Sequence, residues 1–185
     1  EISACLVGSE MCIRDSCKNY THQTKYTLPI PPSPNLPNMK AVYLYPATCY
    51  FEATPVSLGR GTSLPFQIYG HPNMTGYDYS FTPKSVPGAK NPPQLNKLCH
   101  GVNLSNMSDE EIWKRGVDLS YVIDAYKNLN IGDHFFRPFF ELLVGTDYVR
   151  KMIIEGKSAE EIKNRWKGDV EKFKEQRKPY LLYQE

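Results

Sequence analysis

The stretch CHGVNLSNMSDEE, Cys99 to Glu111, decides the fold class, because the chain changes character inside it. Apolar and polar residues alternate in its first half, and Leu98–Leu104 is predicted to form a strand. Ser108, followed three residues later by Glu111, is a capping box, which predicts a helix that begins directly afterwards. Short strands are predicted before this point and helices after it. The sequence therefore predicts an α+β domain: short strands with long proline-rich loops, followed by a C-terminal helical region.

The remaining elements are predicted from the same signals on either side of this stretch. Upstream, short strands are predicted at Ala41–Tyr45, which is ended by Pro46, at Pro65–Gly70 and at Tyr79–Pro83. Downstream, Asp118 is predicted to cap one helix, Arg137–Val144 is predicted to be a second that ends at Gly145, and a third is predicted to start at Thr146 or Asp147. A second capping box, Ser158 with Glu161, predicts a final helix from Ala159. The last is predicted to run to about Gln176, and Gly168 marks a point where it can break.

The beginning of the chain differs from the rest. LVGSEMCIRDS, Leu6 to Ser16, resembles a translated sequencing adapter, so we expect residues 1–16 to be non-native. Residues 17–40 are expected to be a proline-rich connector, since five prolines between Thr27 and Lys40 favour an extended, polyproline-like segment. Two interpretations of this segment stay open: a link to a lost domain, or a loop wrapped around its own domain. Residues 41–185 are expected to form a C-terminal domain.

Composition excludes several classes of function. The 185 residues carry a net charge of only +2, spread along the chain, which gives no case for a nucleic-acid partner. No apolar run approaches the roughly 20 residues of a membrane span. The four histidines show no metal-binding spacing, and we expect neither a metal nor another cofactor. After residue 16, Cys17, Cys49 and Cys99 are too scattered for a disulfide framework, which leaves free thiols or a single bridge.

SLGRGTSLPF, Ser57 to Phe66, is the most suggestive loop. A phosphate loop needs a lysine before Ser or Thr and a helix behind it, and here a predicted strand follows and no lysine is present. Two interpretations remain. In one, the glycines take positive φ in a tight turn and Arg60 makes a structural salt bridge. In the other, the glycines allow close approach of a ligand, and Arg60 offers a planar fork to its carboxylate.

Other polar residues allow a similar choice. Glu52 is either an ion-pair partner of Arg60 or a polar group of a sugar site. Lys90 and Asn91 lie in a proline-stiffened loop that is either simply solvated or the preorganised rim of a cleft. The aromatic run FFRPFF, Phe135 to Phe140, is expected to lie in the core or at a domain contact.

Several blocks, in order, carry a family resemblance: YLYPATCYFEATPVSLGRGTSLPFQIYGHP, SFTPKSVPGAKNPP, KLCHGVNL, IDAY, FFELLVGTDYVRKMIIEGKSAEEI and RKPYLLY. Together they resemble the C-terminal half of the NamZ-type exo-β-N-acetylmuramidases, from Cys17 to Tyr183. The resemblance implies a bacterial, periplasmic or secreted two-domain glycoside hydrolase of cell-wall turnover. A Rossmann-like N-terminal domain, missing from this chain, would be its partner across the active-site cleft. The substrate implied is a peptidoglycan-derived sugar, chiefly N-acetylmuramic acid joined to N-acetylglucosamine.

The resemblance also gives roles to residues. Arg60 is expected to bind the lactyl carboxylate of N-acetylmuramic acid and Thr62 to add a hydroxyl hydrogen bond, with Lys90 and Asn91 as further binding residues. Tyr45 and Tyr69 either stack on the sugar ring or belong to the core. Glu52 is expected to assist catalysis, with the main catalytic carboxylate in the missing domain, so the chain alone should be inactive. The alternatives are a non-catalytic carbohydrate- or peptidoglycan-binding module and a purely structural domain.

Overall fold

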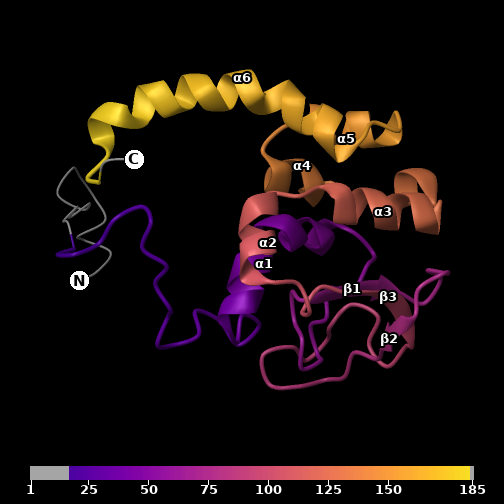
Figure 1. Ribbon diagram of the computed structural model, residues 1–185. Helices are drawn as coiled ribbons and strands as arrows, with labels where there is room; N and C mark the ends of the chain where they lie inside the picture. Colours follow the sequence, from indigo (N-terminus) through magenta and orange to yellow (C-terminus); the bar gives the residue numbers. More distant parts are fainter. Residues whose placement is uncertain (1–16, 184–185) are drawn as a thin grey trace, which may run out of the picture. The chain divides into compact units, whose positions relative to one another are not determined.

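The computed structural model describes residues 17–183, which form two compact units, so the adapter-like residues 6–16 lie outside the described part. The larger unit is Leu28–Arg165. The smaller one comprises residues 17–27 and 166–183. The elements are α1 (Met39–Thr48), the 3₁₀ helix η3 (Cys49–Ala53), β1 (Ile68–His71), β2 (Tyr79–Phe81), β3 (Cys99–Asn103), α2 (Asp109–Arg115), α3 (Ser120–Leu129), η4 (Gly132–His134), α4 (Phe139–Val144), α5 (Tyr148–Ile154), α6 (Ala159–Arg177) and η5 (Lys178–Tyr180) (Figure 1).

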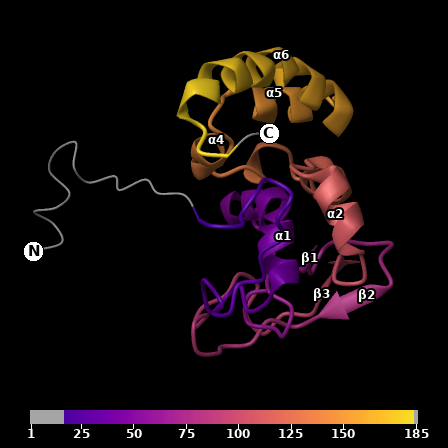
Figure 2. The same ribbon diagram turned by 60° about the vertical axis from the view of Figure 1, so that its left-hand side comes forward.

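A small antiparallel sheet in the order β1-β3-β2 confirms three of the predicted strands and the α+β class. Gly70 pairs with Gly101 across β1 and β3, and Phe81 pairs with Cys99 across β2 and β3. Ile68, Phe81 and Cys99 are buried together on one face. Both views of the larger unit show the strands and their loops at one end, with α4 and α5 at the other (Figure 2).

The predicted strand at Ala41–Tyr45 is wrong, because this segment is the middle of helix α1. The Asn38 side chain caps the helix by accepting a hydrogen bond from the Ala41 N–H at 2.9 Å. Ala41 and Leu44 are buried three residues apart, which is helical rather than strand spacing. Pro46 lies inside the helix, where it has no N–H to donate to the carbonyl four residues earlier.

Both predicted capping boxes mark true helix starts. The Ser108 hydroxyl accepts from the Glu111 N–H at 3.2 Å and opens α2. At α6 the arrangement is reciprocal, since the Ser158 hydroxyl accepts from the Glu161 N–H while the Glu161 carboxylate accepts from the Ser158 N–H. Helix α6 runs without a break through Gly168.

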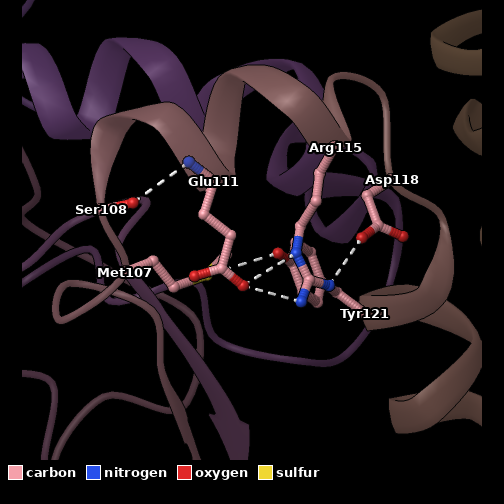
Figure 3. Close-up of polar contacts among 6 residues, drawn as sticks. All are labelled: Met107, Ser108, Glu111, Arg115, Asp118 and Tyr121. Carbon is pink, nitrogen blue, oxygen red and sulfur yellow. Dashed lines mark hydrogen bonds and ion pairs between the residues drawn. The ribbon is translucent and has the colours of Figure 1, made fainter.

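The corner between α2 and α3 is fixed by charged side chains, as Figure 3 shows. Arg115 donates to Glu111 at 2.9 Å and to Asp118 at 3.2 Å. The Asp118 carboxylate also accepts from the Ser120 N–H at 2.8 Å. Ser120 is the first residue of α3, and the N-cap is Leu119 rather than the predicted Asp118. These local contacts set where α3 begins.

The run Phe135–Phe140 supplies core residues, one of the two roles expected for it, although Phe139 is 50% exposed. Phe135 and Phe140 are fully buried, and Phe135 meets Tyr126 of α3 edge to face, with ring centroids 5.3 Å apart. The Arg137 N–H donates to the Ala53 carbonyl at 2.9 Å, which ties this segment to η3. The aromatic core therefore supports the short helix that carries Glu52.

The predicted connector, residues 17–40, is shared between the two units. In the smaller unit the Cys17 N–H donates to the Tyr183 hydroxyl at 2.6 Å, and the Tyr20 and Tyr183 rings lie 5.1 Å apart. In the larger unit the Asn35 amide donates to the Gly88 carbonyl at 3.1 Å. The proline-rich segment after Leu28 thus contacts its own domain.

Candidate functional site

The loop that carries Arg60 is closed at its base. Ser57 and Gly70 exchange two backbone hydrogen bonds of 2.9 Å. At the tip, the Thr62 N–H donates to the Gly59 carbonyl at 3.0 Å, which closes a four-residue turn. Gly61 takes φ +80 at the third position of this turn, as a type II turn requires. Arg60 therefore occupies a corner of a closed, hydrogen-bonded loop.

The glycines beside Arg60 take positive φ, as predicted for a tight turn. The missing side chain of Gly61 also lets another segment of the chain pack directly against the turn. A Cβ on Gly61 would lie 2.3 Å from the Lys84 carbonyl oxygen and 2.8 Å from Cγ of Pro92. The Lys84 N–H donates to the Gly61 carbonyl at 2.9 Å. The proline-rich loop that carries the exposed Lys90 and Asn91 is thereby brought against the Arg60 turn.

Arg60 forms the ion pair with Glu52 that one interpretation of the sequence predicted, through Nη2 and Oε1. About a third of the Arg60 side chain and a quarter of the Glu52 side chain stay exposed. The guanidinium carbon also lies 5.1 Å from the centroid of the Phe66 ring. Among residues 17–183, its other N–H groups have no protein hydrogen-bond partner. A planar fork with open donors can bind a carboxylate.

Tyr45 completes this cluster. The residue is 38% exposed, and its ring centroid lies 5.1 Å from that of Phe66. Burial raises the pKa of the Tyr45 phenol, Glu52 and Cys49 add to the rise, and Arg60 opposes it. A phenol that stays protonated can donate a hydrogen bond at neutral pH. We call Tyr45, Glu52, Arg60 and Phe66 the Arg60 cluster.

The other predicted residues lie differently. The Thr62 hydroxyl is used inside its own loop, donating to the Gly59 carbonyl at 2.7 Å and accepting from the Leu64 N–H at 3.0 Å. Tyr69 is 2% exposed, and its ring stacks on Phe51 with centroids 4.8 Å apart. Tyr69 therefore presents no open ring face.

The Tyr69 hydroxyl belongs to a second polar cluster. It donates to Asp124 of α3 at 2.8 Å, and the Tyr77 hydroxyl donates to the same carboxylate oxygen at 2.7 Å. Burial and the Asp124 carboxylate raise the pKa of both phenols well above its ordinary value. A second tie lies nearby, because the Asn128 side chain exchanges hydrogen bonds of 3.0 and 2.9 Å with the backbone of Thr75. These contacts fasten the segment after β1 to α3.

Sequence reasoning missed a hollow of about 220 Å³ between α1 and α2, lined by Val42, Tyr43, Pro46, Ile112, Trp113 and Gly116. The Tyr43 and Trp113 rings meet edge to face there, with centroids 5.4 Å apart. About half of the Trp113 side chain is exposed. Trp113 in the predicted helix after Ser108 was the one sequence signal for this hollow. Its opposite wall consists of α1 residues, and it exists only because that segment is helical.

A second hollow of about 190 Å³ has a mixed, charged lining of Arg115, Val117, Asp118, Leu119, Ala159, Glu160 and Lys163. Within the described part of the chain, no group of three or more His, Cys, Asp or Glu side chains is placed to hold a metal ion. Cys17, Cys49 and Cys99 are free thiols. No helix between residues 17 and 183 is long and apolar enough to cross a membrane.

Comparison with solved structures identifies the fold. A DUF1343 family protein from Bacteroides fragilis NCTC 9343 matches with a TM-score of 0.89 and 82% sequence identity, over 91% of this chain and 48% of that one. A second DUF1343 family protein from the same organism matches with a TM-score of 0.59 and 20% identity, over 84% of this chain and 45% of that one, and shows the fold alone.

The sequence comparisons identify the family. The profile described as "Exo-beta-N-acetylmuramidase NamZ, C-terminal" matches residues 43–183. The peptidoglycan beta-N-acetylmuramidase NamZ of Bacillus subtilis (strain 168) is 34% identical over 167 residues, which cover 82% of this chain and 40% of that protein. The chain therefore belongs to the family of C-terminal domains of NamZ exo-β-N-acetylmuramidases. It spans less than half the length of these relatives.

Proposed function

We propose that this chain is part of an exo-β-N-acetylmuramidase that removes N-acetylmuramic acid from the non-reducing end of peptidoglycan fragments. The Arg60 cluster would form one wall of its active-site cleft. Family membership and the name of the Bacillus subtilis relative support the reaction. Because the substrate derives from the cell wall, the proposal includes a periplasmic or secreted parent protein with a role in cell-wall turnover.

One observation carries the assignment of the site: Arg60 is partly exposed and has guanidinium donors without a protein partner in residues 17–183. N-acetylmuramic acid differs from N-acetylglucosamine by a lactyl ether that ends in a carboxylate. A guanidinium binds a carboxylate through two parallel N–H···O bonds, which a neutral sugar cannot reproduce. Arg60 would thus select the acidic sugar, and the exposed Lys90 and Asn91 would lie on the neighbouring loop.

Glu52 has a supporting role in this proposal. Glycoside hydrolysis usually needs two carboxyl groups on either side of the scissile bond. Glu52 is held in an ion pair with Arg60, which suits a carboxylate that accepts hydrogen bonds and positions the guanidinium. The main catalytic carboxylate is therefore assigned to the part of the parent enzyme outside this chain, and the chain alone should not cleave its substrate.

The carboxylate preference can be measured on the 185-residue chain by NMR titration with N-acetylmuramic acid and with N-acetylglucosamine. Wild type is expected to prefer the acidic sugar. Arg60→Lys keeps the charge but loses the fork, so the preference should fall about tenfold, the usual worth of one charge-assisted hydrogen bond. Arg165→Lys is the matched control, since Arg165 lies 5.1 Å from the ring centroid of Tyr148, away from the cluster.

Two results would contradict the proposal. One is an unchanged preference in both Arg60→Lys and Arg60→Ala, which would remove Arg60 from the site. The other is release of N-acetylmuramic acid when the chain alone is incubated with its disaccharide with N-acetylglucosamine, which would place the catalytic carboxylates within this chain.

A non-catalytic carbohydrate- or peptidoglycan-binding module is the second candidate, and the hollow lined by Tyr43 and Trp113 favours it. Exposed aromatic side chains combine apolar area with a polar edge, which suits sugar rings. Under this alternative, Trp113→Ala abolishes binding of peptidoglycan fragments while Arg60→Lys leaves it unchanged. Under the muramidase proposal, Arg60→Lys lowers the preference for the acidic sugar and Trp113→Ala leaves it unchanged.

A further inference from the structure

Phe66 has an unusual backbone conformation at the centre of the Arg60 cluster. Its φ is +59, a left-handed value that is uncommon for a bulky side chain, and the residue is 1% exposed. Its neighbours hold it there. The Phe66 N–H donates to the Leu58 carbonyl at 2.8 Å. The Thr48 hydroxyl of α1, which donates to the Leu44 carbonyl at 2.9 Å, also lies 3.4 Å from the Phe66 carbonyl oxygen. Such strain persists only where the surroundings enforce it, and it concentrates at functional sites.

The Phe66 ring lies close to two groups from different parts of the chain. The Arg60 guanidinium carbon lies 5.1 Å from its centroid, and the Tyr45 ring of α1 lies 5.1 Å away with a tilt of 44°. Glycine or asparagine would adopt this backbone at a lower cost. Neither has an aromatic face, so the strained phenylalanine supplies something that an ordinary turn residue lacks.

A cation–π contact holds a guanidinium in a particular way. The negative face of the ring attracts the cation without accepting hydrogen bonds from its N–H groups in the guanidinium plane. Glu52 uses one donor of Arg60, whereas the Phe66 ring uses none. The remaining donors are held in place and stay open to a ligand.

We propose that Phe66 is a positioning residue for Arg60, and that its ring sets the preference of the site for a sugar carboxylate. The proposal rests on the function proposed above, and it adds that selectivity depends on a residue that does not itself touch the sugar. Without the ring, Arg60 should keep its charge, but its guanidinium should no longer be held in one orientation.

The test is the ratio of the two dissociation constants, for N-acetylglucosamine over N-acetylmuramic acid, measured by NMR titration of the full chain. Phe66→Leu should reduce this ratio about three- to tenfold, the usual worth of a partly buried cation–π contact. Phe135→Leu is the control, because Phe135 is equally buried and contacts Tyr126 and Phe136 instead. Partial unfolding weakens the binding of both sugars by the same factor, so it leaves the ratio of their dissociation constants unchanged.

A second measurement needs only wild type. Nuclear Overhauser contacts between the Arg60 side chain and the Phe66 ring should persist when N-acetylmuramic acid is added, while the Arg60 Nε–H resonance shifts. Loss of those contacts on binding overturns the proposal, and so does an unchanged ratio in Phe66→Leu when Arg60→Lys lowers it. If wild type shows no preference between the sugars, the proposed function fails, and the role of Phe66 fails with it.

Discussion

Replacing Gly61 by alanine tests whether the Arg60 turn depends on close contact with the proline-rich loop. The new Cβ would lie 2.3 Å from the Lys84 carbonyl oxygen and 2.8 Å from Pro92 Cγ. A left-handed backbone costs alanine about 1–2 kcal/mol. Displacing packed backbone adds about 1–3 kcal/mol. We therefore expect Gly61→Ala to lower the free energy of unfolding by roughly 2–5 kcal/mol.

Gly76→Ala separates the two contributions, because Gly76 has the same φ of +80 and a Cβ there meets nothing within 4 Å. It should cost only the backbone part, about 1–2 kcal/mol. The melting temperature of Gly61→Ala, followed by circular dichroism, should lie about 4–8 °C below that of Gly76→Ala if the contact is worth about 2 kcal/mol. Equal melting temperatures would refute the close approach of the two loops.

Two further predictions concern titration. The Ser158 N–H and hydroxyl, and then Lys157, lower the pKa of Glu161 below its ordinary value of 4.5. The ionised carboxylate therefore stabilises the fold above pH 4.5, and this contribution is lost as the pH falls through the lower pKa of the folded state. The melting temperature of wild type minus that of Glu161→Gln should be constant near neutral pH and shrink in acid, and a difference that grows in acid would count against the capping box. Burial raises the pKa of Cys49 and of Cys99 to about 11. At pH 8, alkylation of these thiols by iodoacetamide should therefore be at least about tenfold slower in the folded chain than in urea. Equal rates would show that the thiols are exposed.

Local signals in the sequence predicted much of the helical region. The capping boxes at Ser108 and Ser158 involve residues three positions apart, so their chemistry is complete within one turn of helix. The end of α4 at Gly145 is also set locally, because the left-handed φ of +75 at this position suits glycine.

The error at α1 has a definite cause. The five residues before Pro46 are all apolar or aromatic, so they show no periodicity that would separate strand from helix, and a proline next to such a run is typical of the end of a strand. Burial of Ala41 and Leu44 against the rest of the larger unit decides in favour of the helix. Helix α1 also forms one wall of the hollow beside Trp113, which a strand in this segment does not predict.

The Arg60 turn shows how the sequence and the tertiary structure divide the result. Sequence alone indicated a tight turn at Gly59 and Gly61 as one of two interpretations, because φ preference is a property of single residues, and the positive φ of both glycines agrees with it. Only the tertiary structure decided that Glu52 and the Phe66 ring would meet that guanidinium, and that Tyr69 would be buried. Ion pairs and ring contacts depend on distances between separate segments, which packing of the whole domain sets and which spacing along the chain does not encode.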